Sequence, residues 1–169
     1  SISFFADCTV HIDPSAEQLA EIALATHKVA SWYTKDPLKV AMLSFASFGV
    51  NPCSETKKVA RAVELVRQRN SKIEVEGEIQ ADIALSPTLR QRDFPFSSLE
   101  GKANILIFPN LAAANISYKL LTQMGGMSPT GPILVGLNKS AHVMQRSATV
   151  EEIVNMIYIS AYEALHQES

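Results

Sequence analysis

Arg146 is the residue of this sequence whose type and position best suit the binding of an anion. It follows a short apolar segment and precedes a predicted helix, so its guanidinium and the helix dipole can act on the same anion. Its neighbour Gln145 carries an amide where acid–base or covalent chemistry would use an acid or a hydroxyl. The alternative for Arg146 is a weak surface ion pair with Glu151 or Glu152. Glu152 also has the spacing of the reciprocal acid in a helix capping box, which leaves both interpretations open.

Two asparagines, a tyrosine and a lysine lie where a buried strand is predicted to lead into a helix. Asn110 and Asn115 flank the expected start of that helix, and Tyr118 and Lys119 follow one turn later. Because α/β proteins bind ligands at the carboxyl ends of their strands, these side chains are candidates for a pocket wall. A capping role explains either asparagine equally well. Spacing alone does not decide between the two interpretations.

The turn from Ser44 to Gly49 is a third candidate. It follows a predicted buried strand and leads into a helix, and it contains the hydroxyls of Ser44 and Ser47. Hydroxyls and backbone N–H groups at such a turn can hold a phosphate or a carbonyl oxygen. The alternative is a structural turn in which Gly49 supplies a positive φ.

Composition limits the classes of function. The chain has 169 residues, 47% of them hydrophobic, and a net charge of −2, which fits one domain with a substantial core. This charge gives no general attraction to nucleic acid or membrane lipids, and no apolar run approaches the roughly 18 residues of a membrane helix. Cys8 and Cys53 are too few for a disulfide framework, and the N-terminus does not resemble a signal peptide. We therefore expect a cytoplasmic protein without nucleic-acid or membrane partners.

Several common motifs are absent from the sequence. It has no glycine-rich dinucleotide loop, no Walker loop, no zinc-protease motif and no nucleophile elbow. The two cysteines lack metal-site spacing, so no metal site is expected. The chain also begins at Ser1 without a methionine, which we interpret as excision from a longer protein. The histidines are scattered, and each is expected at the surface or at an element edge: His11, His27, His142 and His166.

The elements that must position these residues alternate between strands and helices. Short apolar runs alternate with amphipathic helical patterns, which predicts an α/β fold: a three-layer α/β/α sandwich around a mostly parallel sheet of about five or six strands. The acidic residues that alternate through 73–79 predict a strand with one solvated face. The expected strands are 2–6, 39–45, 73–79, 104–108, 133–137 and 141–144. The expected helices begin after the capping-box sequence 15–18, after Pro52, and at positions 87, 112 and 149.

Taken in order, these segments resemble the C-terminal half of a phosphotransacetylase, an enzyme that transfers acetyl between coenzyme A and phosphate. The resemblance covers nearly the whole chain and implies the isocitrate/isopropylmalate dehydrogenase-like fold of that family. It implies that 1–145 form the second domain and that 146–169 form a terminal helix returning to a first domain that this chain lacks. The segments that carry it are 7–14 with 17–22, 42–45 with Gly49, 76–82, 108–111, 115–119, 131–134, and Arg146 ahead of 153–155.

The resemblance also implies roles for individual residues. The family's catalytic stretch has a serine, an arginine and a glycine in succession, and an aspartate in the helix that follows. The resemblance implies that Gln145 stands at the serine position, Arg146 at the arginine position and Glu152 at the aspartate position. Ser147 stands at the glycine position. The family serine is assigned to transition-state stabilisation and the aspartate to deprotonation of the coenzyme A thiol. An amide and a longer acid change both groups. The implied ligand-binding residues are Ser44, Asn110, Asn115, Tyr118, Lys119, Gly131 and Pro132.

These departures resemble one branch in particular, the phosphotransacetylase-like domain of large bacterial NADP-dependent malic enzymes. That resemblance implies a domain that binds acetyl-CoA, regulates the malic enzyme and forms homodimers or higher oligomers. NADP and a divalent metal would then bind only in an upstream malic enzyme domain. The alternative is the C-terminal part of an active phosphate acetyltransferase that converts acetyl-CoA and phosphate to acetyl phosphate and coenzyme A.

Overall fold

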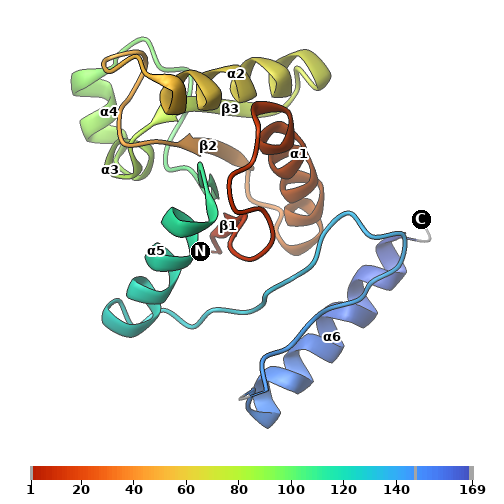
Figure 1. Ribbon diagram of the computed structural model, residues 1–169. Coiled ribbons are helices and arrows are strands. Elements are labelled where there is room, and N and C mark those ends of the chain that lie inside the picture. Colours follow the sequence, from red (N-terminus) through yellow and green to blue (C-terminus); the bar gives the residue numbers. More distant parts are fainter. Residues whose placement is uncertain (1, 147, 168–169) are drawn as a thin grey trace. The chain divides into compact units, whose positions relative to one another are not determined.

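A computed structural model describes residues 2–146 and 148–167 of the chain (Figure 1). The expectations attached to Ser1 and Ser147 lie outside these residues. The chain divides into two compact units, unit 1 from Ser1 to Tyr118 and unit 2 from Lys119 to Ser169. Each unit is described separately. The expected boundary between residues 145 and 146 stays a prediction.

Unit 1 contains a parallel sheet whose four strands lie in the order β1-β4-β2-β3. The strands are β1 (Phe4–Ala6), β2 (Lys39–Leu43), β3 (Glu74–Ile79) and β4 (Ile105–Ile107). All four were predicted, with their ends within one or two residues. The central pairing aligns Met42 with Ile107, and Ala6 aligns with the same residue from the other side.

The predicted helices are present, with one addition. Ser15 caps the first helix in a reciprocal capping box with Gln18, as its spacing predicted. The short helix α3 was not predicted. The helices are α1 (Ala16–Tyr33), α2 (Ser54–Arg69), α3 (Ala81–Leu85), α4 (Pro87–Asp93), α5 (Leu111–Met124) and α6 (Val150–Gln167).

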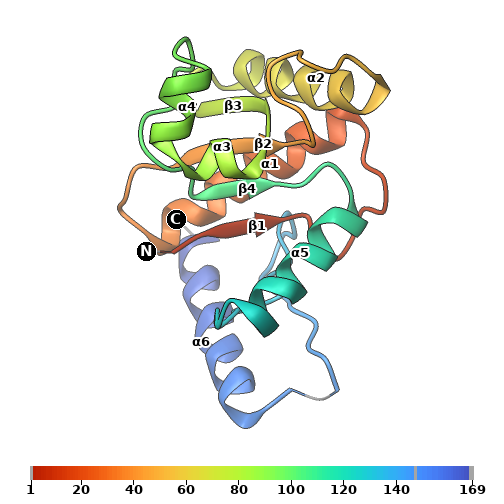
Figure 2. The same cartoon turned by 90° about the vertical axis from the view of Figure 1, so that its left-hand side faces the viewer.

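Alternate residues of each strand enter two different hydrophobic clusters, because side chains of a strand point to opposite faces in turn. Val40 and Met42 pack with α1 and α2 on one face of the sheet. Ala41 and Leu43 pack with α3, the start of α5 and the segment 94–103 on the other. Figure 2 shows the sheet between these layers. The three-layer α/β/α arrangement is therefore confirmed.

The predicted strands 133–137 and 141–144 are wrong: within the described residues the sheet has four strands rather than five or six. Glycines with positive φ lie just before and within the first segment, Gly131 at 140° and Gly136 at 89°. Such values interrupt an extended backbone. The N–H of Leu134 donates to the imidazole of His142 at 3.2 Å instead of to a neighbouring strand. The imidazole of His142 thus accepts the hydrogen bond that a neighbouring strand would accept in a sheet.

The solvated acidic face expected for β3 is also wrong. Glu76 and Glu78 are both buried. Arg67 of α2 forms an ion pair with Glu76, whose second oxygen accepts a hydrogen bond from the Ser97 hydroxyl at 2.7 Å. Glu78 accepts from the N–H of Gly49. These partners allow burial, since a buried charge is stable only when it is paired or hydrogen-bonded.

Candidate functional site

The carboxyl edge of the sheet in unit 1 brings together three of the segments that the sequence singled out. Asp7 follows β1, Ser44 follows β2 and Pro109–Asn110 follow β4. Because β4 lies between β1 and β2, the three strands end side by side, and the segments that follow them begin next to one another. Adjacent strands of a sheet are about 4.8 Å apart. Ligands of parallel α/β sheets bind at such edges.

Asp7 organises the turn after β1. Its carboxylate accepts hydrogen bonds from the N–H groups of Thr9, Val10 and His11 at 2.8, 2.9 and 2.9 Å, and pairs with the His11 ring at 2.7 Å. Burial raises the pKa of Asp7, but these hydrogen bonds outweigh it, so the pKa lies below its ordinary value. The side chain is thus a charged structural anchor.

Cys8 is the next residue along this turn. Burial, together with the negative charge of Asp7, raises the pKa of the Cys8 thiol to about 11. The thiol therefore stays protonated at neutral pH and is a poor nucleophile. Its carbonyl accepts a weak hydrogen bond, 3.5 Å long, from the side-chain amide of Asn115.

Asn110 and Asn115 have different roles in unit 1. The side-chain oxygen of Asn110 accepts from the N–H of Ala113 at 2.9 Å, which makes Asn110 the N-cap of α5. Asn115 connects α5 to the end of β1 instead. Tyr118 and Lys119 follow on the same face of the helix, the first half-buried and the second exposed. The capping interpretation is confirmed for Asn110.

The turn from Ser44 to Gly49 is bonded to the end of β3. The N–H of Ser44 donates to the carbonyl of Ile79, and the N–H of Phe48 to the carbonyl of Glu78, both at 2.9 Å. Gly49 has a φ of 80°, as a structural turn requires. Because these N–H groups already have acceptors, the structural interpretation of the turn is favoured. The Ser44 hydroxyl stays the ligand candidate here.

Unit 2 contains the remaining candidates. Gln145 and Arg146 are both exposed, in an irregular segment just before α6. Glu152 forms the capping box: its carboxylate accepts from the N–H of Thr149 at 2.7 Å, and its own N–H donates to the Thr149 hydroxyl at 3.2 Å. Gly131 and Pro132 precede this segment and are joined by a cis peptide bond.

Sequence reasoning missed a buried polar cluster in unit 2. His142, expected at the surface or at an element edge, has a side chain that is only 2% exposed, and the side chain of Glu163 in α6 is 3% exposed. Their side chains lie 3.1 Å apart, and the Ser140 hydroxyl contacts both. His142 and Glu163 lie 21 residues apart, and no local pattern links them.

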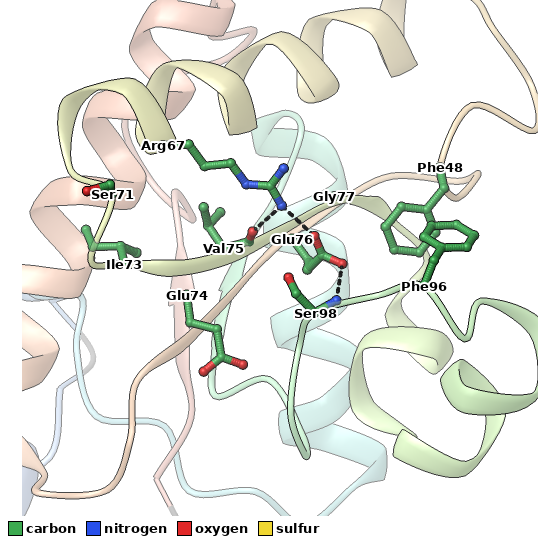
Figure 3. A pocket seen from close by; sticks show the side chains of 10 residues that line it. All are labelled: Phe48, Arg67, Ser71, Ile73, Glu74, Val75, Glu76, Gly77, Phe96 and Ser98. Carbon is green, nitrogen blue, oxygen red and sulfur yellow. Dashed lines mark hydrogen bonds and ion pairs between the residues drawn. The ribbon is translucent and has the colours of Figure 1, made fainter.

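A pocket of about 650 Å³ opens beside β3 in unit 1; its lining includes Phe48 of the Ser44–Gly49 turn but none of the predicted site residues (Figure 3). Its polar groups satisfy one another, because Arg67 bonds both Glu76 and the carbonyl of Val75, and Ser98 donates its N–H to Glu76. We therefore do not assign the chemistry to this pocket. Its lining is Phe48, Arg67, Ser71, Ile73, Glu74, Val75, Glu76, Gly77, Phe96 and Ser98.

Two structural features are absent from the described part of the chain. Among residues 2–146 and 148–167, no three or more His, Cys, Asp or Glu side chains are grouped so that they could hold a metal ion. Within the same ranges, none of the helices has both the length and the apolar character that crossing a membrane requires.

Comparison with known proteins gives a consistent family. A family model described as phosphate acetyl/butaryl transferase matches residues 1–161. Phosphate acetyltransferase of Bacillus subtilis is 38% identical over 161 residues, which cover 95% of this chain and 50% of the relative. The NADP-dependent malic enzyme of Escherichia coli is 41% identical over 166 residues, or 98% of this chain and 22% of the relative.

Solved structures agree with this assignment. A phosphotransacetylase from Streptococcus pyogenes superposes with a TM-score of 0.91 at 38% identity, covering 96% of this chain and 49% of the other. The EutD phosphotransacetylase from Staphylococcus aureus gives 0.89 at 35% identity, with 95% and 49% covered. This chain thus spans about half the length of the phosphate acetyltransferases that it matches.

Proposed function

The chain belongs to the phosphate acetyl/butaryl transferase family, and we propose that it is an acetyl-CoA-binding regulatory domain rather than a working acetyltransferase. The proposal assigns it to the C-terminal part of a malic enzyme. The similarity to a malic enzyme, at 41% identity over 98% of this chain, supports that assignment without excluding the transferase.

The state of Glu152 is the observation that carries the proposal. Glu152 occupies the position of the family's catalytic acid, yet one of its oxygens accepts both the N–H and the hydroxyl of Thr149, at 2.7 and 3.1 Å. A general base needs an acceptor directed at the proton that it removes, and the capping box holds Oε2 against Thr149, which leaves only Oε1 for that role. The neighbouring Gln145 supplies an amide where the family has a hydroxyl. Both features favour binding over acetyl transfer.

The ligand would be acetyl-CoA, with phosphate as the second ligand of the family. In this proposal Arg146 binds an anionic oxygen of the ligand, because an exposed guanidinium offers several donors in a fixed plane. Ser44, Asn110, Asn115, Tyr118 and Lys119 would line the wall built on the sheet edge and α5. Gly131 and Pro132 would let the backbone approach the ligand closely.

Isothermal titration of acetyl-CoA into the full-length protein tests binding. We expect saturable binding that Arg146→Ala weakens by about tenfold or more, since a hydrogen bond to a charged group contributes about 1.5–3 kcal/mol. Lys139→Ala is the matched control, because it removes an exposed cation of unit 2 that is not among the candidates. Absence of acetyl-CoA binding by the wild-type protein would overturn the proposal.

The second candidate is an active phosphate acetyltransferase. In that reaction a phosphate oxygen attacks the thioester carbon, the carbon–sulfur bond breaks, and coenzyme A leaves as a thiolate that takes up a proton. Arg146, Tyr118 and Ser44 would hold the phosphoryl and acetyl oxygens, with Glu152 as the acid–base group. An assay for acetyl phosphate formation by the wild-type protein and by Gln145→Ser separates the transferase from the regulatory domain. Turnover by the wild type supports the transferase, and turnover by Gln145→Ser alone supports the regulatory domain.

Assembly and location belong to the same proposal. We propose a homodimer or higher oligomer in the cytoplasm, linked to an upstream malic enzyme domain that binds NADP and a divalent metal. Light scattering of the full-length protein should give at least twice the mass of one chain. A mass equal to one chain would refute the oligomer and leave the ligand question to the titration.

A further inference from the structure

The buried cluster of unit 2 joins an irregular segment to α6. The imidazole Nε2 of His142 lies 3.1 Å from Oε2 of Glu163 and 3.2 Å from the Ser140 hydroxyl. That hydroxyl also donates to Glu163 at 3.1 Å. The N–H of Leu134 donates to Nδ1 of His142 at 3.2 Å, so Nδ1 is the acceptor and the ring proton is on Nε2, directed at Glu163.

This cluster does not have the arrangement of a hydrolytic triad. In a triad the acid and the nucleophile contact opposite nitrogens of the imidazole, so that the base can take a proton from one side. Here Ser140 and Glu163 contact the same nitrogen, and the other nitrogen is occupied by Leu134. Both ionisable side chains are at most 3% exposed. The cluster is therefore a closed connection between two parts of the backbone, and we assign it no reaction of its own.

The connection fixes one end of a short stretch that carries Arg146. We call the described residues 143–146 and 148 the strap. At its far end Thr149 is fixed to Glu152 by the capping box, and Figure 1 shows the chain reaching α6 at that helix's N-terminal end. At its near end His142 is fixed to Glu163, eleven residues further along the same helix than Glu152.

The two anchored ends limit how far the strap can move. Eleven residues of α6 correspond to about 16 Å along the helix axis, whereas the seven residues from His142 to Thr149 reach at most about 24 Å when fully extended. Part of that length is used in a turn, in which the N–H of Ala148 donates to the carbonyl of Gln145 at 3.1 Å. The backbone at Arg146 is therefore restricted by contacts on both sides, although its side chain is exposed.

We propose that His142 and Glu163 are positioning residues that hold the strap so that Arg146 meets the anionic group of the ligand. The proposal rests on the proposed function, in which Arg146 binds that anion. The anion is of the phosphate class, supplied either by coenzyme A or by free phosphate. A guanidinium binds such a group well only when its planar donors are aligned with it, so a loose strap would cost affinity.

The test is a double-mutant cycle on the full-length protein, read by titration with acetyl-CoA and separately with inorganic phosphate. We expect His142→Ala to weaken the ligand that Arg146 contacts by about tenfold, and Arg146→Ala to weaken it at least as much. The double variant should bind no worse than Arg146→Ala, because a positioning residue has no effect once its target is gone. Independent, multiplying effects would overturn the proposal.

Two conservative variants keep the test informative if His142→Ala does not fold. His142→Gln keeps a donor at the Nε2 position facing Glu163, and we expect its affinity to stay within about threefold of the wild type. His142→Asn keeps only the acceptor near the N–H of Leu134, and we expect it to bind like His142→Ala. The opposite ranking of these two variants would contradict the role given to Glu163.

Hydrogen exchange of the ligand-free protein provides a readout that does not depend on binding. Amides in the strap should exchange at least about tenfold faster in His142→Ala than in the wild type, while those in α1 should be unchanged. Unchanged strap exchange would overturn the proposal even if affinity fell. If the wild-type protein binds neither ligand, the proposed function fails, and the exchange experiment still shows whether His142 restrains the strap.

Discussion

The candidate residues of unit 1 and those of unit 2 are held in place by different means. At the sheet edge, Ser44 comes directly after β2 and Asn110 three residues after β4, and the register of both strands is fixed by backbone hydrogen bonds. In unit 2, Arg146 lies in an irregular segment restrained by side chains, those of His142 with Glu163 and of Thr149 with Glu152. We therefore expect the first region to tolerate changes of single surface side chains, and the loss of one side chain in the second region to loosen a whole segment.

Glycine substitution provides the sharpest contrast between the two regions. In unit 1, Gly77 has a φ of +150°, and an added Cβ would lie 2.6 Å from the carbonyl oxygen of Met42 and 2.8 Å from its Cβ. We expect Gly77→Ala to lower the free energy of unfolding by about 3 kcal/mol or more, measured by guanidinium denaturation. The clash is with neighbouring backbone in the sheet, so the strands must move apart to relieve it.

Gly136 in unit 2 is the matched control for that substitution. Its φ of +89° is equally unusual, but an added Cβ would meet nothing within 4 Å. Gly136→Ala should therefore cost only about 1 kcal/mol, from backbone conformation alone. Equal losses for the two variants would mean that the irregular segment is packed as tightly as the sheet, and the contrast drawn above would be wrong.

Asp7 should give the next largest effect. The carboxylate of Asp7 accepts hydrogen bonds from three N–H groups and pairs with the His11 ring. Asp7→Asn removes its charge, and we expect this to lower the free energy of unfolding by about 1–2 kcal/mol at pH 7. The pKa of Asp7 is lowered in the folded state, so its contribution is complete above the unfolded value of about 3.9 and is lost as the pH falls through the lower folded value.

Denaturation midpoints of the wild type and the Asn variant between pH 7 and pH 2.5 measure this contribution. The difference between the two proteins should stay constant down to about pH 4 and then shrink as the carboxylate of the wild type is protonated. A difference that grew on acidification would mean that Asp7 has a raised pKa, and the anchor role given to its turn would be wrong.

The prediction of the fold from the sequence succeeded where local pattern and tertiary packing agree. The strand β4 and the part of β2 that follows Lys39 are apolar throughout because they are buried on both faces, and their sequence patterns are equally continuous. The capping boxes of α1 and α6 were predicted from spacing alone and are present. Asn110 was predicted at a helix start, and it caps α5.

The failures have a common physical cause, namely partners distant in sequence. Residues 133–137 are as apolar as a strand, but they have no neighbouring strand among the described residues, and Leu134 bonds His142 instead. Glu76 alternates with apolar residues as on a solvated face, yet Arg67 and Ser97 make its burial possible. No periodicity in either segment encodes such partners. This is why the strand assignments in unit 2 and the exposure of Glu76 were predicted less well than the sheet of unit 1.

Helix capping at the sheet edge gives a smaller effect. Asn110→Ala should cost about 1 kcal/mol of unfolding free energy, because the N–H of Ala113 loses its acceptor. Asn110→Ser should restore most of that stability, since serine is an equally good cap. If Asn110→Ser restores stability but not acetyl-CoA affinity, the amide has a ligand-binding role beyond the cap. Thermal unfolding and titration of the same three proteins separate these outcomes.

The alkylation rate of Cys8 reports on the turn after β1, and we expect this experiment to involve almost no change in the stability of the protein. Because the pKa of its thiol is raised to about 11, alkylation by iodoacetamide at pH 8 should be about a hundredfold slower in the folded protein than in urea. A Cys53→Ser background leaves Cys8 as the single thiol.

Burial is the larger cause of the raised Cys8 pKa and the charge of Asp7 the smaller, so Asp7→Asn should restore only part of the lost alkylation rate. Full restoration by Asp7→Asn would mean that the turn after β1 opens without its anchor, and unit 1 would then share the dependence on single side chains that distinguishes unit 2.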